Sequence, residues 1–234
     1  MRINKFLSSL GIASRRAIDK YIEEGRIKVN GAIPSIGIDV NEDDEIYIDN
    51  KKIETKRIEE KVYFILNKPL EVLSASSDDR GRRTVVDLIK TDKRIFPIGR
   101  LDYMTSGLIL LTNDGELFNR LVHPKSEIYK KYYIKVFGEV KKEEIEELKK
   151  GVLLEDGKTL PAKVSGIKYD KNKTSMYISI REGRNRQIRR MIEKFGYKVL
   201  MLRREKIGEL SLGDLKEGKY RELTKEEIEY LYSV

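Results

Sequence analysis

One acidic side chain stands among apolar neighbours in residues 99–117 (GRLDYMTSGLILLTNDGEL). Asp102 lies between Leu101 and Tyr103, shortly before the apolar run 108–111. The glycines and the proline nearby place the acid on a loop that leads into a buried strand. A carboxylate held there can act as a nucleophile or a general base, but an Asp that only hydrogen-bonds its own loop has the same spacing. The loop by itself leaves both interpretations open.

A second stretch, residues 181–196 (REGRNRQIRRMIEKFG), concentrates positive charge. Apolar residues at spacings i, i+3, i+4 and i+7 predict a helix over residues 186–195 with one packed face. Gly183 and Arg184 precede its N-terminus, where backbone amides favour anions. A solvated basic face also uses arginine, but five arginines within ten residues exceed what solubility needs, so we predict phosphate binding. On the side away from the packed face we expect Arg186, Arg189 and Arg190.

Aromatic and basic residues interleave in a third stretch, residues 127–138 (EIYKKYYIKVFG). In a strand, Lys130 and Tyr132 face one side, and Lys131 and Tyr133 face the other. One tyrosine is expected to pack in the core. The other is free to stack on a nucleic-acid base, a contact that contributes ~1–3 kcal/mol in general.

The composition narrows the classes of function. The chain has 48 Lys and Arg against 39 Asp and Glu, a net charge of +9, which favours a polyanionic partner such as nucleic acid over a merely well-solvated surface. It has no cysteine and one histidine, which excludes Cys/His zinc sites, iron–sulfur clusters, disulfides and cysteine nucleophiles. Residues 1–10 are amphipathic, and no apolar run approaches the ~20 residues of a membrane span. We expect a cytoplasmic protein with no membrane partner.

The N-terminal residues predict a small module. Apolar spacing predicts a helix that starts near Ile3 and ends at Gly11, and a second one that is capped by Ser14 and ends at Gly25. Asn30-Gly31 is a strong hairpin turn signal, and alternating residues up to 48 complete the unit. We expect a domain over 1–58, with a charged linker over 50–61, and a second domain over 59–234.

The second domain is expected to be α+β, because its strands and helices do not alternate as βαβ units. Strands are predicted over residues 108–111, 132–137, 176–180 and 199–202. Helices are predicted over residues 116–122, 142–150, 186–195 and 225–232, the last with the capping-box pair Thr224 and Glu227.

Taken together, these motifs resemble a known family. Residues 99–117, 182–191 (EGRNRQIRRM) and 77–89 (SDDRGRRTVVDLI) resemble the RsuA/RluB branch of the pseudouridine synthases, and residues 2–31 resemble an S4 RNA-binding domain. The resemblance implies a catalytic domain with a mixed, mainly antiparallel sheet flanked by helices, preceded by a small α/β S4 module. It also implies an isomerase that detaches uracil from C1′ of a uridine in RNA, rotates the base and rejoins it through C5, without a metal or cofactor.

The resemblance assigns roles to the motif residues. Asp102 is the implied catalytic carboxylate, Tyr132 stacks on the target base with Lys130 as its partner, and Ile188 packs near the uracil. Arg184 aligns with the arginine of the third motif and is expected to pair with Asp102 and keep it ionised. Further contacts to the substrate RNA are expected from Arg80, Arg82, Arg83, Arg100, Gly183, Arg186, Gln187, Arg189 and Arg190. In the S4-like module we expect RNA binding, rather than only solvated helix faces, at Arg2, Lys5, Ser14, Arg15, Arg16, Lys28 and Asn30.

The partner implied by the resemblance is RNA, namely 23S rRNA or a large-subunit assembly intermediate. The longer match over residues 77–89 and 99–108 favours this target over 16S rRNA. A non-catalytic RNA-binding assembly factor is disfavoured because Asp102, Tyr132 and Arg184 occur together, and a glycosidase that stops after cleaving the base is a third alternative. No coiled-coil seam is visible, so we expect a monomer.

Overall fold

The computed structural model describes residues 1–56, 60–123 and 126–234, and it divides into two compact units. The first comprises residues 1–62 with the short segments 92–94 and 113–115, and the second contains the rest. The predicted domain boundary at residues 58–59 lies outside the described residues, as do residues 57–59 of the predicted linker. Within the described residues, none of the helices is long and apolar enough to cross a bilayer.

The N-terminal unit consists of two helices and a small sheet. Helices α1 (Ile3–Ser9) and α2 (Arg15–Glu23) are followed by strands β1 (Ile27–Val29), β2 (Ile46–Ile48) and β3 (Lys51–Lys52). Ser14 caps α2 as predicted, because its hydroxyl accepts a hydrogen bond from the backbone amide of Ala17 at 3.1 Å. The apolar spacing read from the sequence builds the core of this unit, formed by Ile3, Leu7, Ile18, Ile22, Ile27 and Ile46.

The structure of this unit differs from two local predictions, which concern the hairpin at Asn30-Gly31 and the start of the linker. Asn30 and Gly31 form the expected turn, with φ angles of 50° and 84°, but it closes only a single bridge between Val29 and Ala32. The extended antiparallel partner of β1 is β2. The charged linker was predicted to begin at residue 50, whereas β3 pairs with β2 at the edge of the sheet, a position where lysines are common.

The second unit is built on one large sheet. Among the described residues it has nine strands in the path β10-β11-β7-β12-β6-β4-β14, with β5 paired to β6 and β13 to β12. In the described part of the chain, the only parallel pair of this sheet joins β12 to β6, so the sheet is mixed and mainly antiparallel, as predicted. The strands are β4 (Tyr63–Lys68), β5 (Phe96–Ile98), β6 (Ser106–Thr112), β7 (Lys130–Phe137), β10 (Lys163–Tyr169), β11 (Lys173–Ile180), β12 (Lys198–Ile207), β13 (Leu210–Ser211) and β14 (Tyr220–Glu222).

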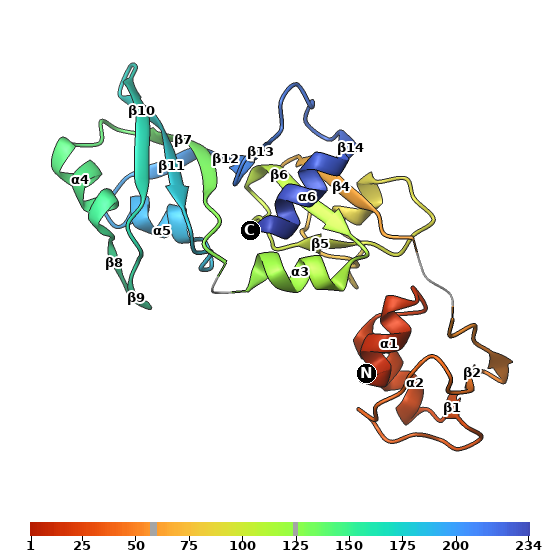
Figure 1. The fold of residues 1–234 in the computed structure, drawn as a ribbon. Helices are drawn as coiled ribbons and strands as arrows, with labels where there is room; N and C mark the ends of the chain where they lie inside the picture. The colour runs from red at the N-terminus through yellow and green to blue at the C-terminus, as the bar shows by residue number, and fades with distance from the viewer. Residues whose placement is uncertain (57–59, 124–125) are drawn as a thin grey trace. The chain divides into compact units, whose positions relative to one another are not determined.

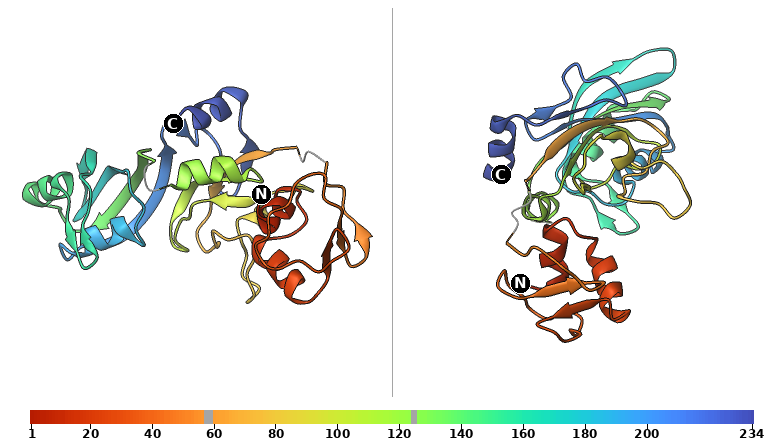
Figure 2. Two further views of the ribbon diagram at one scale, coloured as in Figure 1. Left: turned by 60° about the horizontal axis from the view of Figure 1, so that its bottom comes forward. Right: turned by 90° about the vertical axis from the view of Figure 1, so that its right-hand side faces the viewer.

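The helices of this unit cover two halves of the sheet (Figures 1 and 2). Helices α4 (Lys142–Lys150) and α5 (Gln187–Glu193) pack with β7, β11 and β12 around one apolar core. Helices α3 (Gly115–Val122) and α6 (Lys225–Ser233) pack with β4 and β6 around another. The remaining elements are a 3₁₀ turn, η1 (Val86–Leu88), and the hairpin β8 (Leu153–Leu154) and β9 (Gly157–Lys158).

The two halves meet where β12 pairs with β6. Arg203 lies opposite Ser106, and Arg204 lies opposite Gly107. The backbones approach so closely that a Cβ atom at Gly107, whose φ is 107°, would lie 2.2 Å from the carbonyl oxygen of Arg204. Only glycine fits this position. The loop that carries Asp102 enters β6 at this junction, so the junction determines where that carboxylate lies.

Candidate active site

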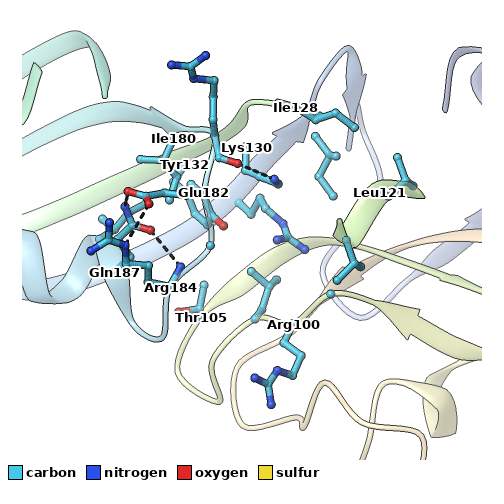
Figure 3. A pocket seen from close by; sticks show the side chains of 18 of the residues that line it. Arg100, Thr105, Leu121, Ile128, Lys130, Tyr132, Ile180, Glu182, Arg184 and Gln187 are labelled. Atoms are coloured by element: carbon cyan, nitrogen blue, oxygen red, sulfur yellow. Dashed lines mark hydrogen bonds and ion pairs between the residues drawn. The ribbon is translucent and has the colours of Figure 1, made fainter. Parts of the chain in front are cut away.

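A cavity of about 600 Å³ lies in the second unit, beside the junction of β6 and β12 (Figure 3). Its walls come from the loop between β5 and β6, from β7, from the end of β11, from the segment before α5 and its first turn, and from β12. These elements are far apart in sequence, and only the order of strands in the sheet brings them together. The lining residues that concern the chemistry are Asp102, Lys130, Tyr132, Ile180, Ile188 and Arg204.

The loop that carries Asp102 is held by its backbone. The hydroxyl of Ser74 donates to the carbonyl oxygen of Leu101 at 2.9 Å and accepts from the amide of the same residue at 3.0 Å. The carbonyl oxygen of Asp102 accepts from the amide of Thr105 at 3.0 Å. In the described part of the chain, no hydrogen bond reaches the Asp102 carboxylate. This favours the reactive interpretation, because the backbone rather than the side chain stabilises the loop.

Arg184 does not pair with Asp102, so that prediction is wrong. Its Nη2 donates at 2.7 Å and its Nη1 at 2.9 Å to backbone carbonyls, and its Nε donates at 3.0 Å to a carboxylate. These bonds tie the segment before α5 to the β8–β9 hairpin. The acceptors are the carbonyl oxygens of Gly157 and Lys158 and the carboxylate of Glu182, and Asp156 adds an ion pair at 3.5 Å.

Arg189 is the arginine whose charge interacts with that of Asp102. It is only 8% exposed, and its Nη2 donates to the carbonyl oxygen of Met104 and, at 3.4 Å, to the hydroxyl of Thr105. Burial lowers the pKa of Arg189, an effect that Arg186 increases and the negative charge of Asp102 opposes. We expected Arg189 on the side away from the packed face, open to RNA, together with Arg186 and Arg190. It is buried instead, because α5 is covered on two sides, by the sheet and by the Asp102 loop.

A second buried cation interacts with Asp102. Lys68, at the end of β4, is fully buried, and its Nζ donates to the carbonyl oxygen of Pro69 at 2.8 Å. Burial lowers its pKa to about 8, and the carboxylates of Asp102 and Glu217 oppose this shift. The negative charge of Asp102 therefore interacts with the positive charges of both Lys68 and Arg189.

Lys130 and Tyr132 come from β7 and line the same cavity, as their alternation in the sequence predicted (Figure 3). The Nζ of Lys130 donates to the carbonyl oxygen of Arg181 at 3.0 Å. Burial lowers the pKa of Lys130, and the charge of Arg204 lowers it further. Tyr132 is half-buried and packs against the edge of the core that β7, β11, α4 and α5 enclose. Tyr133, on the other face, packs edge-on against the ring of Tyr177.

In the first turn of α5, one residue holds the preceding loop in shape and the next lines the cavity. Gln187 is buried, accepts from the amide of Arg184 at 3.1 Å and donates to Glu182 at 2.7 Å, which shapes the loop (Figure 3). Ile188 is 3% exposed and forms an apolar patch of the cavity wall. Gly183 and Arg186 also line the cavity, whereas Arg190 pairs with Asp156 at 3.0 Å.

The other residues that were predicted to contact RNA lie outside the cavity, except Arg100. Arg100 lines it and is exposed (Figure 3). Arg80, Arg82 and Arg83 are exposed on the segment before η1, where Arg82 pairs with Asp78 at 2.7 Å. In the N-terminal unit, Lys5, Arg15 and Arg16 are exposed, and Lys28 donates to Asn50 at 3.3 Å. Other members of the predicted RNA-binding set also have partners within this unit: Arg2 bonds to Gly37, Arg15 donates to Asn4 at 3.4 Å, and Asn30 bonds to Asp44 and Glu45.

The predictions missed Lys68 and Arg204. Nothing in the sequence around Lys68 shows that a lysine at the end of an apolar strand stays inside the protein. For Arg204 the sequence did contain a signal: Arg203 and Arg204 are adjacent and directly follow the strand predicted over residues 199–202, and side chains alternate between faces along a strand. One of the two had to point inward, and it is Arg204, which is 5% exposed.

Residues 62–194 match the RNA pseudouridylate synthase family, and residues 1–46 match the S4 domain. The chain therefore belongs to the RNA pseudouridylate synthase family and is an isomerase that acts on RNA. Its N-terminal unit is the S4 domain that the sequence predicted.

Individual relatives agree with this assignment. The chain is 48% identical to ribosomal large subunit pseudouridine synthase B of Bacillus subtilis (strain 168), over 98% of this chain and 95% of that protein. It is 37% identical to the dual-specificity RNA pseudouridine synthase RluF of Escherichia coli (strain K12), over 100% of this chain and 79% of that protein. A crystal structure of a pseudouridylate synthase superposes with a TM-score of 0.70 at 33% identity, covering 99% of both chains.

Proposed function

We propose that this enzyme converts a uridine of 23S rRNA to pseudouridine, with Asp102 as the catalytic carboxylate. The likeness to a ribosomal large subunit synthase over nearly the whole of both chains supports the substrate. The observation that carries the site is that Asp102, Tyr132 and Ile188, from three distant elements, line one cavity. An rRNA substrate implies a cytoplasmic enzyme. We propose that it acts as a monomer, since the lining residues come from one chain.

The proposed chemistry begins at the glycosidic bond. When C1′–N1 breaks, its electron pair leaves with the uracil and the sugar becomes electron-poor. Two routes suit a carboxylate at this position: Asp102 forms a bond to C1′, or it takes the proton from C2′ to give a glycal. The base then turns, C5 bonds to C1′, and the hydrogen of C5 is lost while N1 gains one. Substrate and product have the same atoms, so the reaction needs no co-substrate, and we propose that no cofactor takes part.

The other residues position the base and the RNA. Tyr132 stacks on the uracil and takes part in proton transfer at C5, while Ile188 supplies an apolar contact to the ring. The target uridine has to leave its stack, which costs a few kcal/mol. Basic residues along the cavity mouth bind phosphates and offset this cost, and the S4 domain raises the local concentration of the RNA.

The experiment is pseudouridine mapping of total rRNA from cells with and without this gene, complemented by the wild type or by Asp102→Asn. We expect one position of 23S rRNA to lose its modification on deletion and to regain it only with the wild type. Modification of 16S rRNA alone would replace the large-subunit target with the small-subunit one. Release of free uracil would indicate a glycosidase, and full rescue by Asp102→Asn would refute the role of Asp102.

A further inference from the structure

Arg204 is a buried cation at the centre of the sheet. On one side β12 pairs with β7, where Arg204 lies directly opposite Tyr132, and on the other it pairs with β6, where Arg204 lies opposite Gly107. Directly opposed residues of paired strands present their side chains on the same face. Arg204 therefore shares a face of the sheet with Tyr132, and both line the cavity that contains Asp102.

Most of the hydrogen-bonding capacity of Arg204 is unused. Its Nε donates to the carbonyl oxygen of Leu108 at 2.7 Å, which holds the guanidinium plane against β6. Its Nη2 is buried and has no partner. Within the described part of the chain, the side chain of Arg204 makes no other hydrogen bond and no ion pair. An arginine that is 5% exposed and lacks a carboxylate partner is costly to retain, unless a ligand completes its bonds.

The wall around Arg204 is suited to an oxygen acceptor. Lys130 lies two residues before Tyr132 on β7, and the charge of Arg204 contributes to lowering its pKa, so two cations share this wall. Lys130 already donates to the carbonyl oxygen of Arg181, whereas the guanidinium of Arg204 still has donors to offer. A cationic wall with free donors selects a ligand whose oxygens carry negative charge.

Two parts of an RNA nucleotide meet this requirement: the phosphate, whose oxygens are always charged, and the uracil ring, whose carbonyl oxygens gain negative charge when C1′–N1 breaks. Arg204 lies opposite Tyr132, the residue proposed to stack on the base, and it is buried rather than at the cavity mouth. A phosphate stays with the RNA backbone, whereas the flipped base enters the pocket. The position of Arg204 thus favours the base.

We propose that the guanidinium of Arg204 donates to a carbonyl oxygen of the target uracil and stabilises the negative charge that collects there when C1′–N1 breaks. The electron pair of that bond leaves with N1 and is delocalised onto the ring oxygens, while Asp102 acts on the sugar. A donor fixed in place by Leu108 needs no rearrangement as this charge develops. This proposal rests on the proposed function and adds a residue that contacts the leaving base.

The first test is kinetic and uses the full-length enzyme with an RNA fragment that carries the mapped uridine. We expect Arg204→Met to lower kcat by about 100-fold or more, as for other removed donors to a developing charge. The matched control is Arg203→Met, on the same strand but the opposite face, where the side chain pairs with Glu205 in an exposed ion pair. We expect less than about twofold change for the control. A kcat for Arg204→Met equal to that of the control would overturn the proposal.

The second test separates base from phosphate. In the Asp102→Asn background, affinity is measured for RNA with the target uridine and for the same RNA with an abasic site. We expect Arg204→Met to weaken binding of the uridine RNA about tenfold and that of the abasic RNA hardly at all. Equal weakening of both RNAs would indicate a phosphate contact, and no weakening would indicate a purely structural arginine, so either result would overturn the proposal.

Two controls keep the tests decisive. If Arg204→Met does not fold, Arg204→Lys replaces it. A lysine keeps the charge but lacks the planar fork of donors that the guanidinium holds between Leu108 and the base, so the same pattern is expected with a smaller loss. Wild-type activity on the fragment is measured first. An inactive wild type would count against the proposed function, whereas an active wild type with an equally active Arg204 variant counts only against this inference.

Discussion

The guanidinium of Arg189 lies beneath the loop that carries Asp102, where it donates to the carbonyl oxygen of Met104 and interacts with the charge of the Asp102 carboxylate. It therefore holds the backbone of this loop and supplies a positive charge that interacts with the acid. Arg184, five residues earlier, is bonded instead to the β8–β9 hairpin and to Glu182.

This relationship predicts different effects for two arginine variants. We expect Arg189→Met to lower kcat by about 100-fold or more, because the charge beside Asp102 is lost. The unfolding free energy should also fall by about 1–3 kcal/mol, because the carbonyl of Met104 loses its donor. Arg184→Met should lower kcat less than tenfold. Steady-state kinetics and urea denaturation measure both, and equal losses of kcat in the two variants would contradict the assignment.

The hydroxyl and the ring of Tyr132 should have separable effects. We expect Tyr132→Phe to lower kcat about 100-fold with little change in KM, because the ring is kept and only proton transfer suffers. Tyr132→Ala should in addition raise KM about tenfold, since base stacking is lost. Release of tritium from RNA labelled at C5 of uridine follows the reaction. An unchanged kcat for Tyr132→Phe would limit the role of this residue to stacking.

Because burial lowers the pKa of Lys68, the free energy of unfolding should depend on pH in alkaline solution. Its pKa is about 8 in the folded protein and 10.5 ordinarily, so between these values the unfolded chain binds more protons than the folded one. The unfolding free energy therefore rises with pH across this window. Relative to Lys68→Met, the wild type should gain about 3 kcal/mol from pH 7.5 to 10.5. Urea denaturation of both proteins at several pH values tests this. A difference in unfolding free energy between them that stays flat or falls with pH would contradict the lowered pKa of Lys68.

Exposed cations of the S4 domain should contribute to RNA affinity and not to the chemical step. We expect Arg16→Gln to raise KM, leave kcat unchanged, and reduce the slope of log Kd against log salt by about one. Lys56→Gln changes the net charge equally, but Lys56 pairs with Asp43 at 3.1 Å in the same domain. We expect little effect from it. Equal slopes for the two variants would show that overall charge, rather than a phosphate contact, determines binding.

The helices were predictable because the interactions that define them are local. The apolar spacing in residues 142–150 and 225–232 and the capping pair Thr224 and Glu227 gave both helices to within one residue. The strands β5, β13 and β14 were missed, because they have two or three residues each and no alternation long enough to recognise. Their strand conformation depends on distant partners, such as β4 for β14.

The features of the site likewise divide into those that follow from the sequence and those that depend on the tertiary structure. The sequence by itself determined the family, the basic character of the chain, the S4 domain and the motif residues Asp102 and Tyr132, because these follow from residue type and spacing. Only the tertiary structure decided that Arg189 rather than Arg184 interacts with the charge of Asp102, and that Lys68 and Arg204 are buried. Arg189 contacts a loop 85 positions away, and Arg204 a strand 96 positions away. Contacts over such separations are set by strand order and helix packing, which residue spacing does not encode.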